Sequence, residues 1–133
     1  MRTTLMLGAL LIAHGAFGLD VARAGQAGTT RVELQRHDLS IPGHEALQLR
    51  VSFDPGAKFP MHRHPGEEII YVLEGTLKYE VEGRAPVTLK AGDVLFVPAG
   101  VAHSANNIGN VVAAELGTFV VDKSKPLVTF VKE

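Results

Sequence analysis

The sequence predicts a single all-β domain that follows an N-terminal secretory leader. Three observations support this fold class: short segments with period-two apolar alternation follow one another closely, 14 glycines and 7 prolines supply turn residues, and nothing beyond the leader has a helical period. Many short strands separated by turns indicate a β-sandwich or β-barrel. A chain of 133 residues is long enough for one domain with its own core.

The first 24 residues differ in kind from the rest. Arg2 precedes an apolar run from Leu5 to Leu19, and small residues follow at Ala22-Arg23-Ala24. One positive charge, a short apolar run and small residues at a cleavage point are typical of a secretory signal peptide. We therefore expect residues 1–24 to be removed and the protein to be exported, to the periplasm or the medium, without a stable membrane anchor. A buried core helix or an uncleaved anchor is the alternative.

Composition limits the partners and the chemistry. The formal charge of −1 gives no reason to expect a nucleic-acid or anionic-membrane partner. The chain has no cysteine, which excludes disulfides, thiolate zinc sites and thiol catalysis. Any metal ion must therefore be held by histidine, carboxylate or backbone oxygen.

The expected strands begin after a small, polar segment. Residues 25–44 are interpreted as a leader segment and first strand, and residues 45–133 as the β-barrel domain. Between 45 and 53, Leu47, Leu49, Val51 and Phe53 alternate on one face. The segments 69–74 and 76–82, on either side of Gly75, are interpreted as a hairpin. The remaining expected strands are 86–89, 94–97, 101–108, 111–121 and 127–131.

Two of these strands are apolar on both faces, namely 69–73 and 94–97. Such strands need cover on both sides. One side would face the barrel interior, and the other would be covered by the N-terminal strand or by a second subunit. We expect a homodimer, since symmetric pairing is the commoner arrangement.

The candidate functional residues begin with His62 and His64. Side chains alternate along an extended chain, so two histidines one residue apart point to the same side. The turn at Pro65-Gly66 then returns Glu68 toward them. His103 follows a second proline–glycine turn, at Pro98–Gly100, and would complete a site of three nitrogens and one oxygen.

These two stretches resemble the two motifs of the cupin superfamily. The first fits G(X)5HXH(X)3-4E(X)6G and the second fits G(X)5PXG(X)2H(X)3N, with no departure at any prescribed position. The matching residues are Gly56, His62, His64, Glu68 and Gly75 in the first, and Gly92, Pro98, Gly100, His103 and Asn107 in the second. The resemblance implies a small single-domain cupin of jelly-roll topology, with metal ligands at His62, His64, Glu68 and His103.

Other polar residues near the motifs have simpler interpretations. We expect His37 and His44 to be surface or satisfied core residues. Glu67 and Arg63 should face away from the metal ligands because they alternate with them. Asn107 is either a partner of a metal ligand or a turn-forming residue, the second being favoured.

The metal would be a single divalent transition ion. Three imidazoles and one carboxylate suit iron, manganese, nickel, copper, cobalt or zinc. If the chain acquires its metal after export, the affinity order favours copper and zinc.

The leading functional hypothesis is a metal-dependent enzyme, either dioxygenase-like or a lyase or isomerase, acting on a small oxygenated substrate. Glu68 is a candidate base. Dioxygenases that act on flavonols are among the members of the family that the chain resembles. The alternative is a metal-bearing ligand-binding or sensor module without turnover, because no independent acid–base pair is evident. Polar residues that could face the pocket are Gln48, Arg50, Tyr79 and Glu115.

Overall fold

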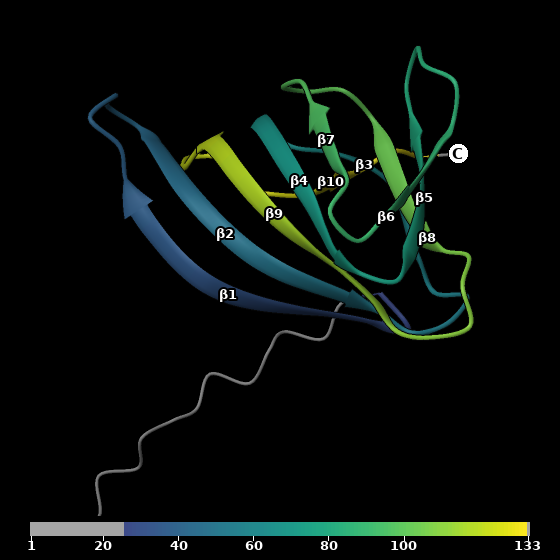
Figure 1. The fold of residues 1–133 in the computed structure, drawn as a ribbon. Helices are drawn as coiled ribbons and strands as arrows, with labels where there is room; N and C mark the ends of the chain where they lie inside the picture. The colour runs from purple at the N-terminus through teal and green to yellow at the C-terminus, as the bar shows by residue number, and fades with distance from the viewer. Residues whose placement is uncertain (1–25, 133) are drawn as a thin grey trace, which may run out of the picture.

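The computed structural model describes residues 26–132 and contains ten strands in two antiparallel five-stranded sheets (Figure 1). The secretory leader expected at residues 1–24 lies outside the described residues. The strands are β1 (Thr29–Asp38), β2 (His44–Phe53), β3 (Lys58–Arg63), β4 (Gly66–Glu74), β5 (Thr76–Val81), β6 (Val87–Lys90), β7 (Val94–Val97), β8 (His103–Asn107), β9 (Ala113–Asp122) and β10 (Thr129–Phe130). The all-β prediction is confirmed. Within residues 26–132, no helix has the length and apolar character needed to cross a membrane.

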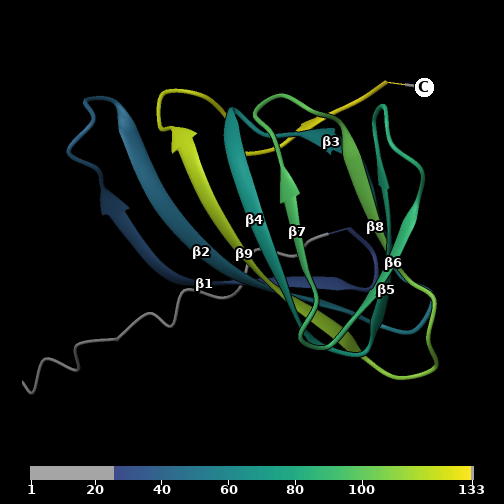
Figure 2. The same cartoon turned by 45° about the horizontal axis from the view of Figure 1, so that its top comes forward.

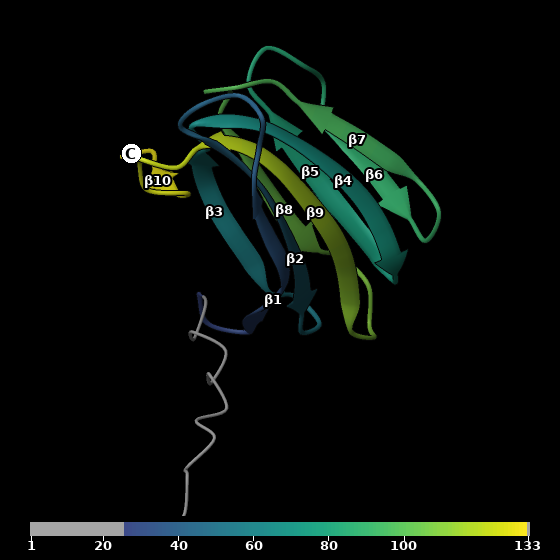
Figure 3. The same cartoon turned by 90° about the vertical axis from the view of Figure 1, so that its left-hand side faces the viewer.

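Consecutive strands alternate between the two sheets from β3 to β5. The first sheet has the order β1-β2-β9-β4-β7 and the second has the order β10-β3-β8-β5-β6. In Figure 3, β10 lies beside β3 near the C-terminal end of the described chain. This interleaving of two sheets is the jelly-roll arrangement that the sequence predicted.

The predicted hairpin around Gly75 is wrong. Its two strands, β4 and β5, belong to different sheets, so Gly75 is a corner between sheets and not a hairpin turn. The glycine has a φ of 74°, and a Cβ there would lie 2.6 Å from the Cβ of Ala113. Both features require glycine, and they are compatible with a hairpin or with a corner. The sequence signal was therefore a turn signal, without information on the strand partner.

The core lies between the two sheets. On β2, the alternating residues Leu47, Leu49, Val51 and Phe53 are buried as expected. Residues from the second sheet, including Leu77 and Tyr79 on β5, face them from the other side. The inner faces of the two sheets therefore form one enclosed interior.

The outer face of β4 and β7 is apolar and exposed. Ile69 lies opposite Phe96 and Tyr71 lies opposite Val94 in the strand register, and these four residues are between 45% and 64% exposed. The N-terminal strand does not cover them, because β1 and β7 lie at opposite edges of this sheet (Figure 2). The sequence analysis offered the N-terminal strand or a second subunit to cover this face. The second subunit stays a prediction.

Candidate metal centre

The four predicted ligand residues meet in the interior. His62 lies near the end of β3, His64 follows in the turn to β4, Glu68 lies in β4, and His103 begins β8. None of the four is more than 6% exposed. The turn at residues 65–66 carries the chain from the second sheet to the first, so that Glu68 faces the histidines across the interior.

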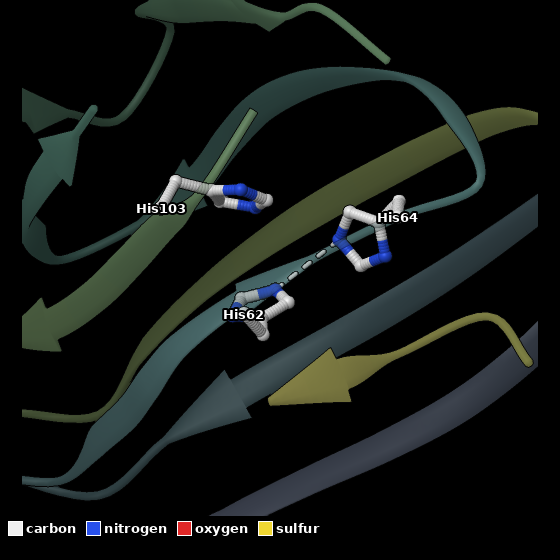
Figure 4. A group of neighbouring side chains, drawn as sticks. All are labelled: His62, His64 and His103. Atoms are coloured by element: carbon white, nitrogen blue, oxygen red, sulfur yellow. Dashed lines mark hydrogen bonds between the residues drawn. The ribbon is translucent and has the colours of Figure 1, made fainter. Parts of the chain in front are cut away.

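The nitrogen and oxygen atoms of this group converge. The Nε2 atoms of His62 and His64 are 3.2 Å apart, and Glu68 Oε2 lies 2.9 Å from His103 Nε2 and 3.2 Å from His64 Nε2. One nitrogen from each histidine lies within 4.8 Å of the others. Figure 4 shows the three rings gathered, with His103 approaching from a different strand.

The outer nitrogen of each histidine faces a backbone carbonyl. A carbonyl oxygen only accepts hydrogen bonds, so each Nδ1 carries a proton and leaves the Nε2 lone pair directed inward. The distance from Nδ1 to the carbonyl oxygen is 2.7 Å for His62 and Pro60, 2.6 Å for His64 and Leu127, and 3.2 Å for His103 and Val101. Three inward lone pairs and a carboxylate require a cation between them, either protons or a metal ion. This donor set fits a divalent transition metal.

Two of these groups have strongly lowered pKa values. Burial, together with the neighbouring His103 and His64, lowers the pKa of His62 to about 3. Burial by itself raises the pKa of Glu68, but hydrogen bonds with His103 and His64 outweigh it and hold the value at about 2. Neutral imidazole and ionised carboxylate are the forms that bind metals.

A pocket opens beside the four residues. It is partly open to solvent, and its cavity volume is about 30 Å³. Most of its wall is apolar and comes from both sheets and from the C-terminal segment. The apolar lining includes Leu49, Val51, Phe53, Phe59, Ile70, Phe119, Leu127 and Val128.

Two further polar side chains line this pocket, Tyr79 on β5 and Glu115 on β9. The Tyr79 hydroxyl donates a hydrogen bond to Glu115 Oε2, across the space between the sheets. Burial and the nearby Glu68 raise the pKa of Glu115 to about 8, although the bond from Tyr79 lowers it. Burial and the carboxyl of Glu115 raise the pKa of Tyr79. The sequence placed both residues among the pocket candidates but gave no reason to pair them.

The other two pocket candidates lie elsewhere. Gln48 donates a hydrogen bond to Thr118 at 3.0 Å, and Arg50 forms an ion pair with Glu74. Neither Gln48 nor Arg50 lines the pocket. The sequence also missed Arg31, which lines the pocket from β1 with its guanidinium carbon 5.5 Å from the centre of the Phe59 ring.

The predictions for the flanking polar residues are confirmed. Glu67 is exposed, and Arg63 forms an ion pair with Glu82 at 2.9 Å, outside the cluster. Asn107 is 1% exposed, and its side chain forms hydrogen bonds with backbone groups of neighbouring turns and not with the four clustered residues. Its Nδ2 donates to the carbonyls of Phe53, Asp54 and Val111, and its Oδ1 accepts from the Gly109 N–H.

Comparison with known families decides the family. The family model described as the cupin domain matches residues 49–121, which is more than half of the chain and includes all four clustered residues. The chain is a cupin. The family that its two motifs resembled is therefore confirmed.

Three known proteins illustrate the range of similar cupins. The oxalate-binding protein of Thermotoga maritima is 42% identical over 65 residues, covering 48% of this chain and 53% of that protein. Dimethylsulfoniopropionate lyase DddQ of Ruegeria pomeroyi is 41% identical over 61 residues, covering 45% and 30%. A structure of recombinant oxalate oxidase in complex with glycolate superimposes with a TM-score of 0.65 at 26% identity, covering 80% of this chain and 57% of that one. The chain thus spans about half or less of the length of these two curated relatives.

Proposed function

We propose that this cupin binds one divalent transition metal through His62, His64, Glu68 and His103 and uses it to act on a small oxygenated substrate. The observation that carries the proposal is the orientation of the imidazoles. Each donates its Nδ1 proton to a backbone carbonyl, so the Nε2 atoms and the Glu68 carboxylate face one centre. Iron, manganese, copper, zinc and nickel all suit this donor set.

The chain's own residues would select the ligand. A divalent ion would supply Lewis acidity toward an oxygen ligand. Since Glu68 contributes the one negative charge among the four ligands, the site would keep a positive charge and favour an anionic oxygen. The apolar pocket wall limits access of water and accommodates a small, partly apolar molecule.

Two functional classes remain, and each has support among the relatives. Similarity to a lyase and to an oxalate oxidase favours an enzyme, either dioxygenase-like or a lyase or isomerase. Similarity to an oxalate-binding protein favours a ligand-binding module without turnover. We favour the enzyme because the pocket adds a buried acid, Glu115, beside the ligand cluster.

Metal content tests the ligand assignment. The native protein should contain about one metal ion per chain, and His103→Ala should lose most of it because three ligands remain. His37→Ala is the matched control, since His37 lies exposed on β1. Equal metal content in His103→Ala and the native protein would refute the assignment.

Turnover tests the functional class. The metal-loaded protein should consume oxygen or deplete substrate with a member of a panel of small diketones, phenols and sugar acids. Stoichiometric binding without turnover would favour the ligand-binding module. The His103→Ala variant is the control for activity that does not depend on the site.

We also propose export and a homodimer. Export rests on residues 1–24, and the mature protein should begin after Ala24 when its N-terminus is sequenced from the periplasm or medium. The proposed dimer pairs the outer face of β4 and β7 with the same face of a second copy, since packing two copies of an exposed apolar face together removes both from water. Light scattering should give twice the chain mass, and Phe96→Glu should give the monomer mass. A monomeric native protein at micromolar concentration would refute the dimer.

A further inference from the structure

One of the three clustered histidines depends on a distant segment for its orientation. For His62 and His103, the carbonyl that accepts the hydrogen bond from Nδ1 belongs to the residue two positions earlier in the chain. The Nδ1 of His64 donates instead to the carbonyl of Leu127, which is 63 residues away in the sequence and 2.6 Å away in the structure. Two of the partners are therefore local, and the third is present only when the segment that contains Leu127 is docked.

Residues 127–131, which we call the strap, also form part of the pocket wall. The first two of these residues are half-buried and line the pocket. Beyond them, β10 lies against β3 (Figure 3). The centre of the Phe130 ring lies 5.7 Å from that of Phe59 and 6.4 Å from that of His62. The strap therefore contacts the histidine cluster twice, through the Leu127 carbonyl and through the Phe130 ring.

The strap is held by fewer contacts than the strands around it. β10 has two residues and stands at the edge of its sheet, where it pairs with β3. The backbone N–H of Val131 donates to the carbonyl of Met61 at 3.0 Å, and residues 129–132 are exposed. Short, exposed edge segments open locally at a lower free energy than the core. Since β3 also pairs with β8, the strap can open while the rest of both sheets stays paired.

Opening of the strap releases the ring of His64. This ring rotates about two side-chain bonds, and the hydrogen bond at Nδ1 determines which nitrogen faces the cluster. Phe119 packs against the ring at 4.9 Å between centres but has no oxygen to accept the Nδ1 proton. With the strap docked, the Leu127 carbonyl accepts that proton and leaves Nε2 directed inward. Partners of this kind typically change metal affinity tenfold to hundredfold.

We propose that the strap is a positioning element of the metal site: its Leu127 carbonyl orients His64, and a divalent metal ion enters and leaves while the strap is open. This inference rests on the proposed function, because the ion is the one assigned to His62, His64, Glu68 and His103. It adds the regulation of that site, since one movement opens the pocket wall and loosens one ligand.

The Val131→Pro variant tests the docking of the strap. Proline has no N–H, so the bond to Met61 is lost, and proline favours the extended backbone that Phe130 already has in β10. Zinc release from the loaded protein into excess chelator should become about fivefold to tenfold faster, the effect of one hydrogen bond on an opening equilibrium. Lys132→Pro is the matched control, because that N–H donates to no group within residues 26–132. Equal release rates from the native protein and Val131→Pro overturn the inference, as does equal acceleration in Lys132→Pro.

Phe130 provides a second way to release the strap. Phe130→Ala removes the ring that packs against Phe59 and His62, so zinc release should again become severalfold faster. Phe130→Leu retains a large apolar side chain and should stay within about twofold of the native rate. Phe130 is 46% exposed, so neither change leaves a cavity in the core. A native release rate in Phe130→Ala overturns the inference.

The Nδ1 protons of the metal-free protein separate ring orientation from general loosening. NMR on protein with isotope-labelled histidine measures how fast each proton exchanges with water, and His64→Gln and His103→Gln assign the signals. In Val131→Pro, the His64 proton should exchange at least about fivefold faster, because its acceptor leaves with the strap. The His103 proton has a local acceptor and should keep its native rate. Equal acceleration of both protons, or of neither, overturns the inference.

The two kinds of failure are distinguishable. A native protein that retains zinc, with the same release rate in Val131→Pro and Phe130→Ala, overturns the strap and leaves the proposed function standing. A native protein that retains no metal at the cluster overturns the proposed function and this inference together.

Discussion

Two polar bridges cross the interior of this cupin, and each joins a carboxyl group on the first sheet to a ring on the second. Glu68 on β4 contacts His103 on β8, and Glu115 on β9 accepts a hydrogen bond from Tyr79 on β5. Both carboxyl groups are nearly inaccessible, at 2% and 5% exposed. Burial alone would raise the pKa of both.

The two bridges nevertheless differ in charge. Burial raises the pKa of Glu68, but its contacts with His103 and His64 outweigh this effect and lower the value to about 2. Burial and the like charge of Glu68 raise the pKa of Glu115 to about 8, although the hydrogen bond from Tyr79 lowers it. In the metal-free protein, the partners therefore determine whether a buried carboxyl group is ionised or neutral at neutral pH. Carboxyl groups whose pKa values diverge in this way are typical of sites with divided roles.

The same substitution at both positions should show this difference most strongly. Glu68→Gln removes the anionic ligand, and we expect metal affinity to fall about a thousandfold, more than the tenfold to hundredfold loss typical of residues around a metal ligand. Glu115→Gln should change metal affinity by no more than about twofold, because Glu115 is outside the donor set. Competition with a metal-binding dye measures both. Equal losses in the two variants would contradict the separate roles.

The half of the metal cluster that contains Glu68 was predictable from the sequence because its parts are local. His62, His64 and Glu68 lie within seven residues of one another, and strand alternation with one turn is enough to bring them together. His103, 35 residues from Glu68, was a candidate because it follows a second proline–glycine turn, and the family resemblance then implied it as a ligand. Tyr79 and Glu115 are 36 residues apart and meet only because β5 and β9 face each other. No spacing rule covers that contact.

The same limit applies to the fold. Period-two alternation and turn residues predicted the strands and the all-β class, since both are properties of short segments. Which strands pair depends on packing of the whole chain, so β4 and β5 were assigned to a hairpin although they lie in different sheets. Gly75 requires a positive φ in either case.

The pH dependence of stability is expected to show the next largest effect. Glu115 has a pKa of about 8 in the folded protein, against an ordinary glutamate value of 4.5 for the unfolded chain. Between these values the folded state binds a proton that the unfolded state has released, so stability falls as pH rises. The loss should reach about 3 kcal/mol between about pH 5 and pH 8. The Glu115→Gln variant lacks this titrating group, so its free energy of unfolding should fall correspondingly less over the same pH range.

Urea unfolding of the metal-free proteins measures this effect. The other groups near Glu115 are Tyr79 from β5, Glu68 from β4 and Arg31, which lines the same pocket from β1. They are present in both proteins, so the difference between the two curves isolates Glu115. Parallel curves for the native protein and Glu115→Gln would show that Glu115 does not titrate in this range.

The smallest expected effect concerns the energy of the second bridge. Tyr79→Phe removes the hydroxyl and leaves Glu115 Oε2 without its donor, which should cost about 1–2 kcal/mol of unfolding free energy. Adding Glu115→Leu removes both polar partners, so the double variant should be more stable than the sum of the single changes predicts, with a coupling of about 1 kcal/mol. Metal content should not change in any of the three variants. Additive single changes would mean that the hydrogen bond contributes no net energy. The pair would then be retained for the pocket and not for the joining of the sheets.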